Sequence, residues 1–200
     1  MRPIVPGVEA WEAWQPSELA PRLRDVGVPW AVAAGWAIEL HVGGAPRAHE
    51  DLEIAIARSD FPAVRATLAE LEWFGVGDGR VTPIDEAADD LHQTWGLDRR
   101  SHVWRLDVFR EPWEGDTWVC RRDPSLRRPV ADVIEHTRDG IPYLVPEIVL
   151  LFKAKHAGRE RDQADLARAL PLLTSEQRRW LGDALRLVHP GHDWIPLVGA

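Results

Sequence analysis

The chain has 200 residues, a formal net charge of −8 and a single cysteine, Cys120. This length fits one domain or a compact domain with a small appendage, and one cysteine excludes an internal disulfide. The acidic balance argues against general nucleic-acid binding, which needs a basic face to displace counterions from phosphates, and suits a small cationic partner.

Helices and strands are predicted to alternate over the N-terminal half. Residues 1–7 lack an apolar segment of signal-peptide length, and the longest apolar run, 29–38, is too short to span a bilayer, so we expect a cytoplasmic protein without membrane association. Periodicity and capping residues predict a helix from 16 or 17 to 26, a strand over 30–33, a helix over 35–42, a strand over 52–57 and a helix from 59 or 60 to 71. The G-x-G-x-G pattern at 75–79 predicts a hairpin turn, because no helix suited to a phosphate loop follows it.

The second half changes from strands to helices. Residues 82–101 have the composition of a loop and are a candidate lid, whereas 101–110 predicts a strand, followed by short strands near Trp118, Val133 and Tyr143. Helices are predicted over 146–156, 162–173 and 175–188. We therefore expect an α+β fold: a mixed β-sheet core with helices on one side over 1–145, and a helical C-terminal part over 146–200 that is either separate or continuous with the core.

Two acids on one predicted strand are the first candidate site residues. Asp51 and Glu53 alternate with apolar residues, and side chains two apart on a strand share a face at a spacing of about 6.6–6.8 Å. A solvated strand edge would explain an arbitrary acidic pair. Here Ala55 and Ala57 continue the same face with small apolar side chains, which indicates the wall of a cleft.

A third acid, Asp107, lies in an otherwise apolar predicted strand. A lone carboxylate there costs free energy unless it is paired or bound to a metal, and Arg105 or Arg110 could supply an ordinary salt bridge. If the strands of Asp107 and Glu53 are neighbours, about 4.8 Å apart, three carboxylates can surround one point. That arrangement suits a pair of Mg²⁺ ions about 3.5–4 Å apart.

The combined pattern resembles a known superfamily. The segments Ala34-Gly35-Trp36 and Arg47-x-His49-x-Asp51-x-Glu53, with Asp107 on a later strand, resemble the nucleotidyltransferases that have a DNA polymerase β-like palm. Within that superfamily the chain is most similar to the aminoglycoside and lincosamide nucleotidyltransferases, which modify antibiotics. The resemblance is strongest over 29–57, moderate over 103–109 and weaker over 144–166.

The resemblance implies a mechanism and a set of ligands. Asp51 and Glu53 would bind two Mg²⁺ ions, and Asp107 would complete the metal site and help to deprotonate an acceptor hydroxyl. The acceptor would attack the α-phosphorus of a nucleoside triphosphate (NTP) in line, so the partners would be an NTP and a small molecule. The backbone N–H groups at Gly35 and Trp36 would approach the triphosphate.

Basic residues near both ends of the pattern are candidate phosphate ligands. Arg47 and His49 precede the strand, where they either meet phosphate or hold the loop to the acids. Only two lysines occur, Lys153 and Lys155, and the resemblance implies that a lysine here faces the cleft. Helical spacing separates them by about 200°, which favours Lys155 for the cleft wall, and a solvated basic face is the alternative.

Two departures from the family pattern leave three interpretations open. The family usually has glycine where this chain has Ala34, and aspartate where it has Glu53. The first interpretation is a Mg²⁺-dependent enzyme that transfers a nucleoside monophosphate from an NTP to a hydroxyl of a small acceptor, for example an aminoglycoside- or lincosamide-like antibiotic. The second is a weakly active or inactive relative with a binding or antitoxin-like role. The third keeps the chemistry with a protein or tRNA acceptor. The oligomeric state is left open.

Overall fold

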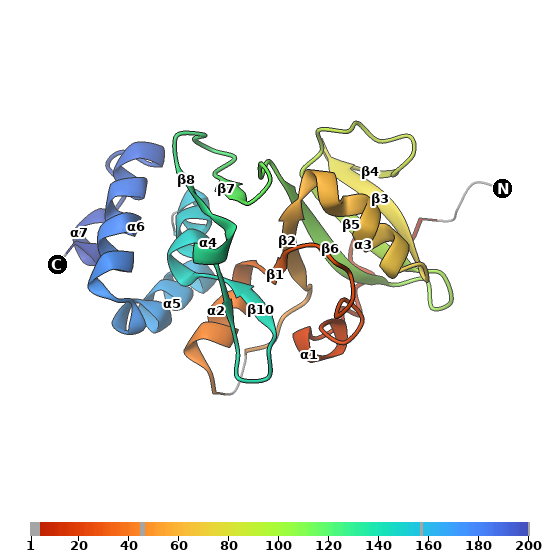
Figure 1. Ribbon diagram of the computed structural model, residues 1–200, viewed down its shortest axis with the longest axis horizontal. Coiled ribbons are helices and arrows are strands. Elements are labelled where there is room, and N and C mark those ends of the chain that lie inside the picture. Colours follow the sequence, from red (N-terminus) through yellow and green to blue (C-terminus); the bar gives the residue numbers. More distant parts are fainter. Residues whose placement is uncertain (1–4, 45–46, 157, 200) are drawn as a thin grey trace.

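A mixed eight-stranded sheet forms the centre of the protein in a computed structural model that describes residues 5–44, 47–156 and 158–199 (Figure 1). Its strands are β1 (Trp30–Val32), β2 (Glu53–Ala57), β3 (Leu71–Gly77), β4 (Arg80–Pro83), β5 (Gln93–Asp98), β6 (Trp104–Glu111), β9 (Ile134–His136) and β10 (Pro142–Leu144). Their order is β4-β3-β5-β6-β2-β1-β10-β9, with β2 parallel to β6, β1 parallel to β10 and the other pairs antiparallel. A separate hairpin consists of β7 (Thr117–Val119) and β8 (Arg127–Pro129).

The helices complete an α+β fold, which confirms the predicted fold class. They are α1 (Pro16–Leu19), α2 (Ala34–Val42), α3 (Phe61–Thr67), α4 (Pro146–Lys153), α5 (Glu160–Ala169), α6 (Ser175–Val188) and α7 (Ile195–Val198). Helices α5, α6 and α7 gather at one end of the molecule, and β3, β4 and β5 lie at the other (Figure 1). None of the helices in the described ranges is long and apolar enough to cross a membrane.

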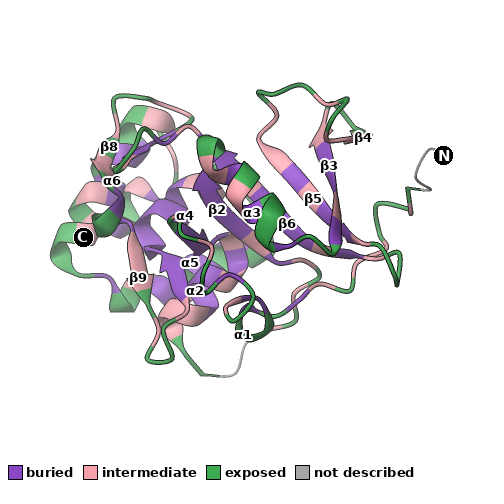
Figure 2. Ribbon diagram, turned by 45° about the vertical axis from the view of Figure 1, so that its right-hand side comes forward, coloured by how far each residue is buried: buried purple, intermediate pink, exposed green. Residues whose placement is uncertain are grey.

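The hydrophobic core explains why the inner elements form where they do. Strands β1 and β2 are almost wholly buried, and α4 buries six of its eight residues, so these elements form the purple centre of Figure 2. A continuous apolar run is typical of strands covered on both faces. Helix α6 begins at a capping box, in which the side chains of Thr174 and Gln177 each accept a hydrogen bond from the other residue's backbone N–H. This agrees with its predicted start at Ser175.

Over residues 16–101, three predictions of secondary structure are wrong. The first helix ends at Leu19 rather than 26, because Pro21 has no backbone N–H to continue the helical hydrogen bonds, although Leu19 and Leu23 are fully buried as their spacing predicted. The helix that begins after Asp60 ends at Thr67, and Leu71 instead opens β3. The predicted loop over 82–101 contains β5, which pairs with β3 on one side and β6 on the other.

Candidate functional site

The three predicted carboxylates lie in one cleft. Glu53 of β2 is directly opposite Asp107 of β6 in the parallel pair, and the Asp107 N–H donates to the Leu52 carbonyl at 2.8 Å. Asp51 lies two residues before Glu53, and all three acids line a cleft of about 610 Å³. The predicted adjacency of their strands is therefore confirmed.

Each of these carboxyl groups has a raised pKa. Burial raises the pKa of Asp107 to about 7, and the charge of Asp51 adds to it, whereas a hydrogen bond from Gln93 acts in the opposite direction. Burial also raises the pKa of Glu53 well above its usual value, reinforced by the charges of Asp51 and Asp107. The pKa of Asp51 is raised mainly by burial. Asp107 is buried and Asp51 and Glu53 are half-buried, and neighbouring acids that oppose one another's ionisation favour a cation among them.

Asp107 has one satisfied and one free oxygen. Gln93 Nε2 donates to Oδ2 at 2.7 Å, while Oδ1 is buried and has no hydrogen-bond partner in the described part of the chain. The alternative salt bridges are not present there. Arg105 Nε lies 3.4 Å from Asp98 Oδ2, and the Arg110 guanidinium lies over the Phe61 ring at 5.5 Å.

The donor chemistry of this site fits Mg²⁺. Carboxylate oxygens are the ligands that Mg²⁺ prefers, and a buried, unpartnered Oδ1 on Asp107 is an atom that a cation would satisfy. Across the described ranges, no three His, Cys, Asp or Glu side chains are already arranged as a metal centre. Binding would therefore require the three side chains to draw together.

The turn that enters α2 differs from its expected form. Ala34, not Gly35, has a positive φ, +49°, a region in which a side chain is strained. A Cβ at Gly35 would lie 2.5 Å from Arg47 Nη2 and 2.9 Å from His49 Cε1. Glycine is therefore needed at position 35 for the close approach of these two side chains, which favours the interpretation that they hold the loop.

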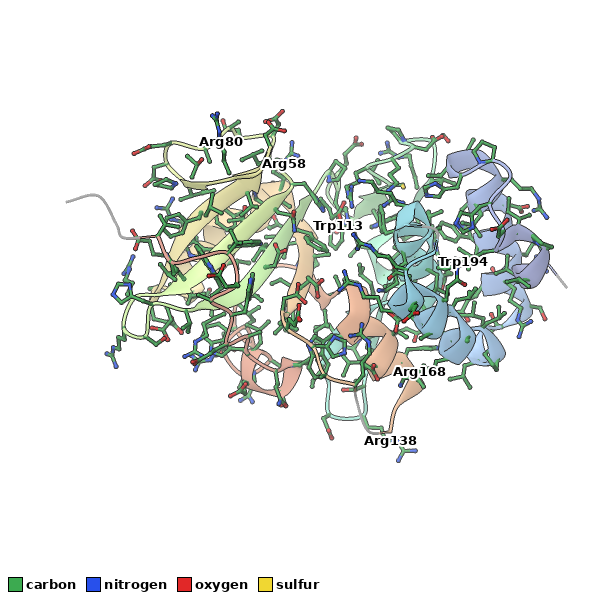
Figure 3. All side chains as sticks on the ribbon, turned by 180° about the vertical axis from the view of Figure 1, so that it is seen from behind. Arg58, Arg80, Trp113, Arg138, Arg168 and Trp194 are labelled. Carbon is green, nitrogen blue, oxygen red and sulfur yellow. The ribbon has the colours of Figure 1, made fainter. Side chains whose placement is uncertain are left out.

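Arg47 and His49 belong to a polar cluster around the buried Glu39. Arg168 of α5, which is labelled in Figure 3, donates two hydrogen bonds of 2.7 Å to Glu39. His49 Nε2 lies 3.6 Å from Glu39 Oε1. The His49 ring stacks on Trp36 with centroids 4.4 Å apart. Burial and the Arg47 charge lower the pKa of His49 to about 4, so the ring is neutral at pH 7. Trp36 therefore positions His49. The backbone N–H of Trp36 lies in the first turn of α2.

Both lysines line the cleft, with Lys153 electrostatically linked to the acids. Its Nζ lies 3.0 Å from Asp162 Oδ1 and 2.8 Å from Asp165 Oδ2, and its charge lowers the pKa of Glu53. The preference for Lys155 assumed a continuous α-helix. Helix α4 instead ends at Lys153 and continues as a 3₁₀ turn over Ala154–His156, so the 200° separation does not apply.

Several residues of the cleft were not identified from the sequence. They are His92, Gln93, Glu111, Arg121, Arg122, Arg159, Arg161 and Asp162. Glu111 carries a usable signal, because it is four residues after Asp107, one residue beyond the predicted strand over 101–110. If that strand continues by one residue, as β6 does, Glu111 lies on the same face as Asp107. Gln93 comes from β5, Arg161 and Asp162 come from α5, and the others come from loops. The positions of these segments in the cleft depend on the tertiary structure.

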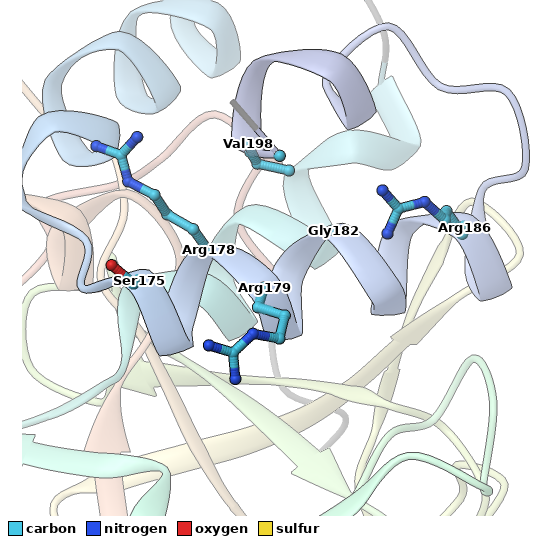
Figure 4. Close-up of a pocket in the computed structure, with 7 residues that line it drawn as sticks. Ser175, Arg178, Arg179, Gly182, Arg186 and Val198 are labelled. Atoms are coloured by element: carbon cyan, nitrogen blue, oxygen red, sulfur yellow. The ribbon is translucent and has the colours of Figure 1, made fainter.

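A second hollow, of about 380 Å³, lies between α6 and α7 (Figure 4). Its arginines are already engaged in part: Arg178 donates to the carbonyls of Leu170 and Leu173, and Arg186 pairs with Asp183 at 2.8 Å. No carboxylate lines it in the described chain, so it lacks the chemistry of the main cleft.

Comparisons with known proteins support the resemblance inferred from the sequence. A family model described as aminoglycoside-2''-adenylyltransferase matches residues 17–93, a segment that contains the turn, Asp51 and Glu53 but not Asp107. A search of curated protein sequences found no significant match.

Solved structures share the fold. The solution structure of the antibiotic-resistance factor ANT(2'')-Ia is 12% identical, with 86% of this chain and 89% of that chain covered and a TM-score of 0.57. Its crystal structure with adenylyl-2''-tobramycin gives 10% identity, coverage of 86% and 94%, and a TM-score of 0.55. The lincomycin-bound lincosamide adenylyltransferase LnuA gives 17% identity, coverage of 76% and 92%, and a TM-score of 0.51. The chain thus has the fold of the antibiotic adenylyltransferases, as its sequence pattern indicated.

Proposed function

We propose that this protein is a Mg²⁺-dependent nucleotidyltransferase that moves a nucleoside monophosphate from an NTP to a hydroxyl of a small acceptor. The observation that carries the proposal is the parallel pairing that sets Glu53 beside Asp107, with Asp51 on the same cleft wall and the pKa of all three acids raised. The family match over 17–93 supports an adenylyltransferase, with ATP as the NTP.

The acids and the basic residues have separate roles in this proposal. Asp51, Glu53 and Asp107 would hold Mg²⁺, which neutralises phosphate charge and polarises the α-phosphate when it is bound. The basic cleft residues Lys153, Lys155 and Arg161, with Arg47 beside the turn, would offset the charge of the triphosphate. The acids and the basic residues line the same cleft. A reaction between a metal-bound polyphosphate and a neutral nucleophile requires both.

The transfer itself needs positioning and one proton acceptor. The acceptor oxygen forms a bond to the α-phosphorus, the bond from that phosphorus to the bridging β-phosphate oxygen breaks, and pyrophosphate leaves. The hydroxyl proton passes to Oδ1 of Asp107, the oxygen that Gln93 leaves free. The protein forms no covalent bond, so catalysis depends on orientation and charge neutralisation.

The acceptor is proposed to be an antibiotic-sized molecule, and the biological role to be antibiotic resistance. The structural neighbours carry the names of tobramycin and lincomycin in their complexes, and the cleft of about 610 Å³ has room for a molecule of that size beside a nucleotide's phosphates. An enzyme that consumes NTP is expected in the cytoplasm, where NTP is made.

An inactive, ligand-binding relative is the second candidate. It is favoured by one observation: Arg47 and His49 pack against Gly35, over the turn where a triphosphate would otherwise approach, and Ala34 is strained there. In such a protein NTP would not stabilise the fold.

Nucleotide binding separates the two candidates. A ligand at 100 times its Kd adds about 2.7 kcal/mol to the free energy of unfolding, so Mg²⁺ with ATP should raise the melting temperature measurably. A melting temperature unchanged by all four NTPs with Mg²⁺ would support the inactive relative.

Asp107→Asn tests the catalytic assignment. The amide keeps the shape of the side chain but is a poor proton acceptor and metal ligand, so pyrophosphate release should fall at least about 100-fold. The exposed Asp116→Asn is the control and should retain full activity. An active Asp107→Asn enzyme would remove Asp107 from the reaction.

A further inference from the structure

Four polar side chains at the far end of the cleft have no part in the transfer described above. They are His92, Glu111, Arg121 and Arg122, which we call the distal cluster. Glu111 Oε1 lies 3.7 Å from Arg121 Nε and 3.8 Å from His92 Nε2, so both contacts are longer than hydrogen bonds. Arg122 is held by the carbonyls of Leu151 and Phe152.

The distal cluster contains buried polar atoms that lack partners. Glu111 is only 3% exposed, and its Oε2 has no hydrogen-bond partner within the described chain. The same is true of both ring nitrogens of His92. Unpartnered buried polar atoms cost free energy, so their grouping in a cleft indicates a ligand that completes their hydrogen bonds.

The direction of the reaction places the acceptor at this cluster. The turn into α2 lies at the start of β2, because the Ala33 N–H donates to the Glu53 carbonyl. Glu111 lies at the end of β2, where it is paired with Ala57, four residues after Glu53. Four residues of strand span about 13 Å. In an in-line transfer the attacking hydroxyl and the departing pyrophosphate lie on opposite sides of the phosphorus. If the turn and the lysines hold the pyrophosphate end, the acceptor lies toward Glu111.

The charges of the distal cluster select the kind of acceptor. Two guanidinium groups, Arg121 and Arg122, lie around a single carboxyl group, Glu111. Burial lowers the pKa of His92 to about 3, so its ring is neutral at pH 7 and adds no positive charge. The two arginines would repel an ammonium group, and the Glu111 carboxylate would repel an anionic group. A hydroxyl can donate to Glu111 and accept from Arg121, which satisfies both.

The aromatic surfaces of the cluster agree with such a ligand. His92 stacks on Phe109 with centroids 4.8 Å apart, and the guanidinium groups of Arg121 and Arg122 lie 4.8 and 4.9 Å from the centroid of Phe152. Flat faces edged by hydrogen-bonding groups suit the apolar face and hydroxyl rim of a ring.

We infer that the distal cluster binds the acceptor through hydroxyl groups, and that the part of the acceptor held there is an uncharged, sugar- or cyclitol-like ring rather than the polyamine ring of an aminoglycoside. The placement of the acceptor rests on the proposed function. The chemistry of the ring rests on the distal cluster itself.

Equilibrium binding without turnover tests this inference. Ligand-observed NMR with the Mg²⁺-loaded protein would compare glucose with glucosamine and myo-inositol with an amino-inositol, pairs that differ in one hydroxyl replaced by an ammonium group. We expect the neutral member of each pair to bind at least tenfold more tightly. Equal or tighter binding of the amino member, or no binding of either neutral ligand, would overturn the inference.

Variants of the distal cluster and a matched pair outside the cleft sharpen the test. Arg121→Gln and Glu111→Gln should weaken neutral-ring binding at least fivefold, and Arg121→Glu should reduce or reverse the preference against the amino ligand. The exposed ion pair of Glu114 and Arg127 supplies the controls, Glu114→Gln and Arg127→Gln, which should bind like the parent protein. Cluster variants that bind like these controls would refute the assignment.

The proposed function and this inference can fail separately. If Mg²⁺–ATP binds and pyrophosphate is released with a polyamine as the only acceptor, the transferase stands and the neutral-ring inference is wrong. If the neutral ligands bind as expected and no NTP shifts the melting temperature, the distal cluster is a ligand site and the transferase proposal is wrong.

Discussion

Ala34 shows how one residue sets the character of the site. Its φ of +49° is a conformation that costs a non-glycine residue about 1–2 kcal/mol, and the resemblance implies glycine at this position. Ala34→Gly removes that strain and adds about 0.5–1 kcal/mol of unfolded-state entropy. We expect a net gain of about 0.5–1 kcal/mol, measured as a higher midpoint of urea unfolding. Ala37→Gly, a buried position inside the same helix, should instead lose about 1 kcal/mol or more.

Glu111 makes the stability of the protein depend on pH. Burial raises the pKa of this carboxyl from 4.5 to about 7, so the folded state holds its proton more tightly than the unfolded state. This tighter proton binding contributes to the free energy of unfolding. The contribution is complete below pH 4.5, is lost as the pH rises through 7, and amounts to at most about 3 kcal/mol. Glu111→Gln should therefore raise the melting temperature at pH 8 and change it little at pH 4.5. A gain of equal size at both pH values would show that ionisation of Glu111 is not the cause.

At the scale of elements, β5 supplies the side chain that orients Asp107 in the cleft. Gln93 begins this strand and donates to Asp107 Oδ2, so Gln93→Leu leaves a second buried carboxylate oxygen without a partner. We expect a loss of about 1–3 kcal/mol in unfolding free energy, together with a lower kcat because Asp107 loses its orientation. The next residue, Thr94, is a control on the same strand: its buried hydroxyl has no partner, so Thr94→Val should be neutral or stabilising. Chemical denaturation and steady-state rates measure both variants.

The same strand shows where sequence patterns are sufficient and where they are not. Strand β2 and helix α6 could be predicted because their apolar periods and caps are local properties. β5 could not, because Gln93, Thr94 and Gly96 give no alternating signal, and its strand character comes from pairing with β3 and β6. Asp51 and Glu53 follow one local pattern, and Asp107 could be added because it is a lone acid in an apolar strand. The distal cluster instead combines residues from a loop, a strand and the segment after β7.

At the scale of the whole molecule, a set of ion pairs with buried carboxylates, here called the polar seam, joins the C-terminal helices to the sheet core. Arg168 of α5 donates two hydrogen bonds to the buried Glu39 of α2, and Lys153 forms ion pairs with Asp162 and Asp165. Because α4 is buried beside α2, we expect residues 1–145 and 146–200 to unfold together in one calorimetric transition. Two separated transitions would show that the C-terminal part is an independent domain.

Arg168→Met tests the strength of this seam. The substitution leaves the Glu39 carboxylate, whose side chain is 2% exposed, without its bidentate partner, so the free energy of unfolding should fall by about 3 kcal/mol and the melting temperature by about 6–12 °C. The double variant Glu39→Met/Arg168→Met removes the buried charge as well and should recover part of that loss. Arg186→Met, which breaks the exposed pair with Asp183, should cost less than about 1 kcal/mol. If Arg168→Met cost no more than Arg186→Met, the seam would not be what joins the C-terminal helices to the sheet core.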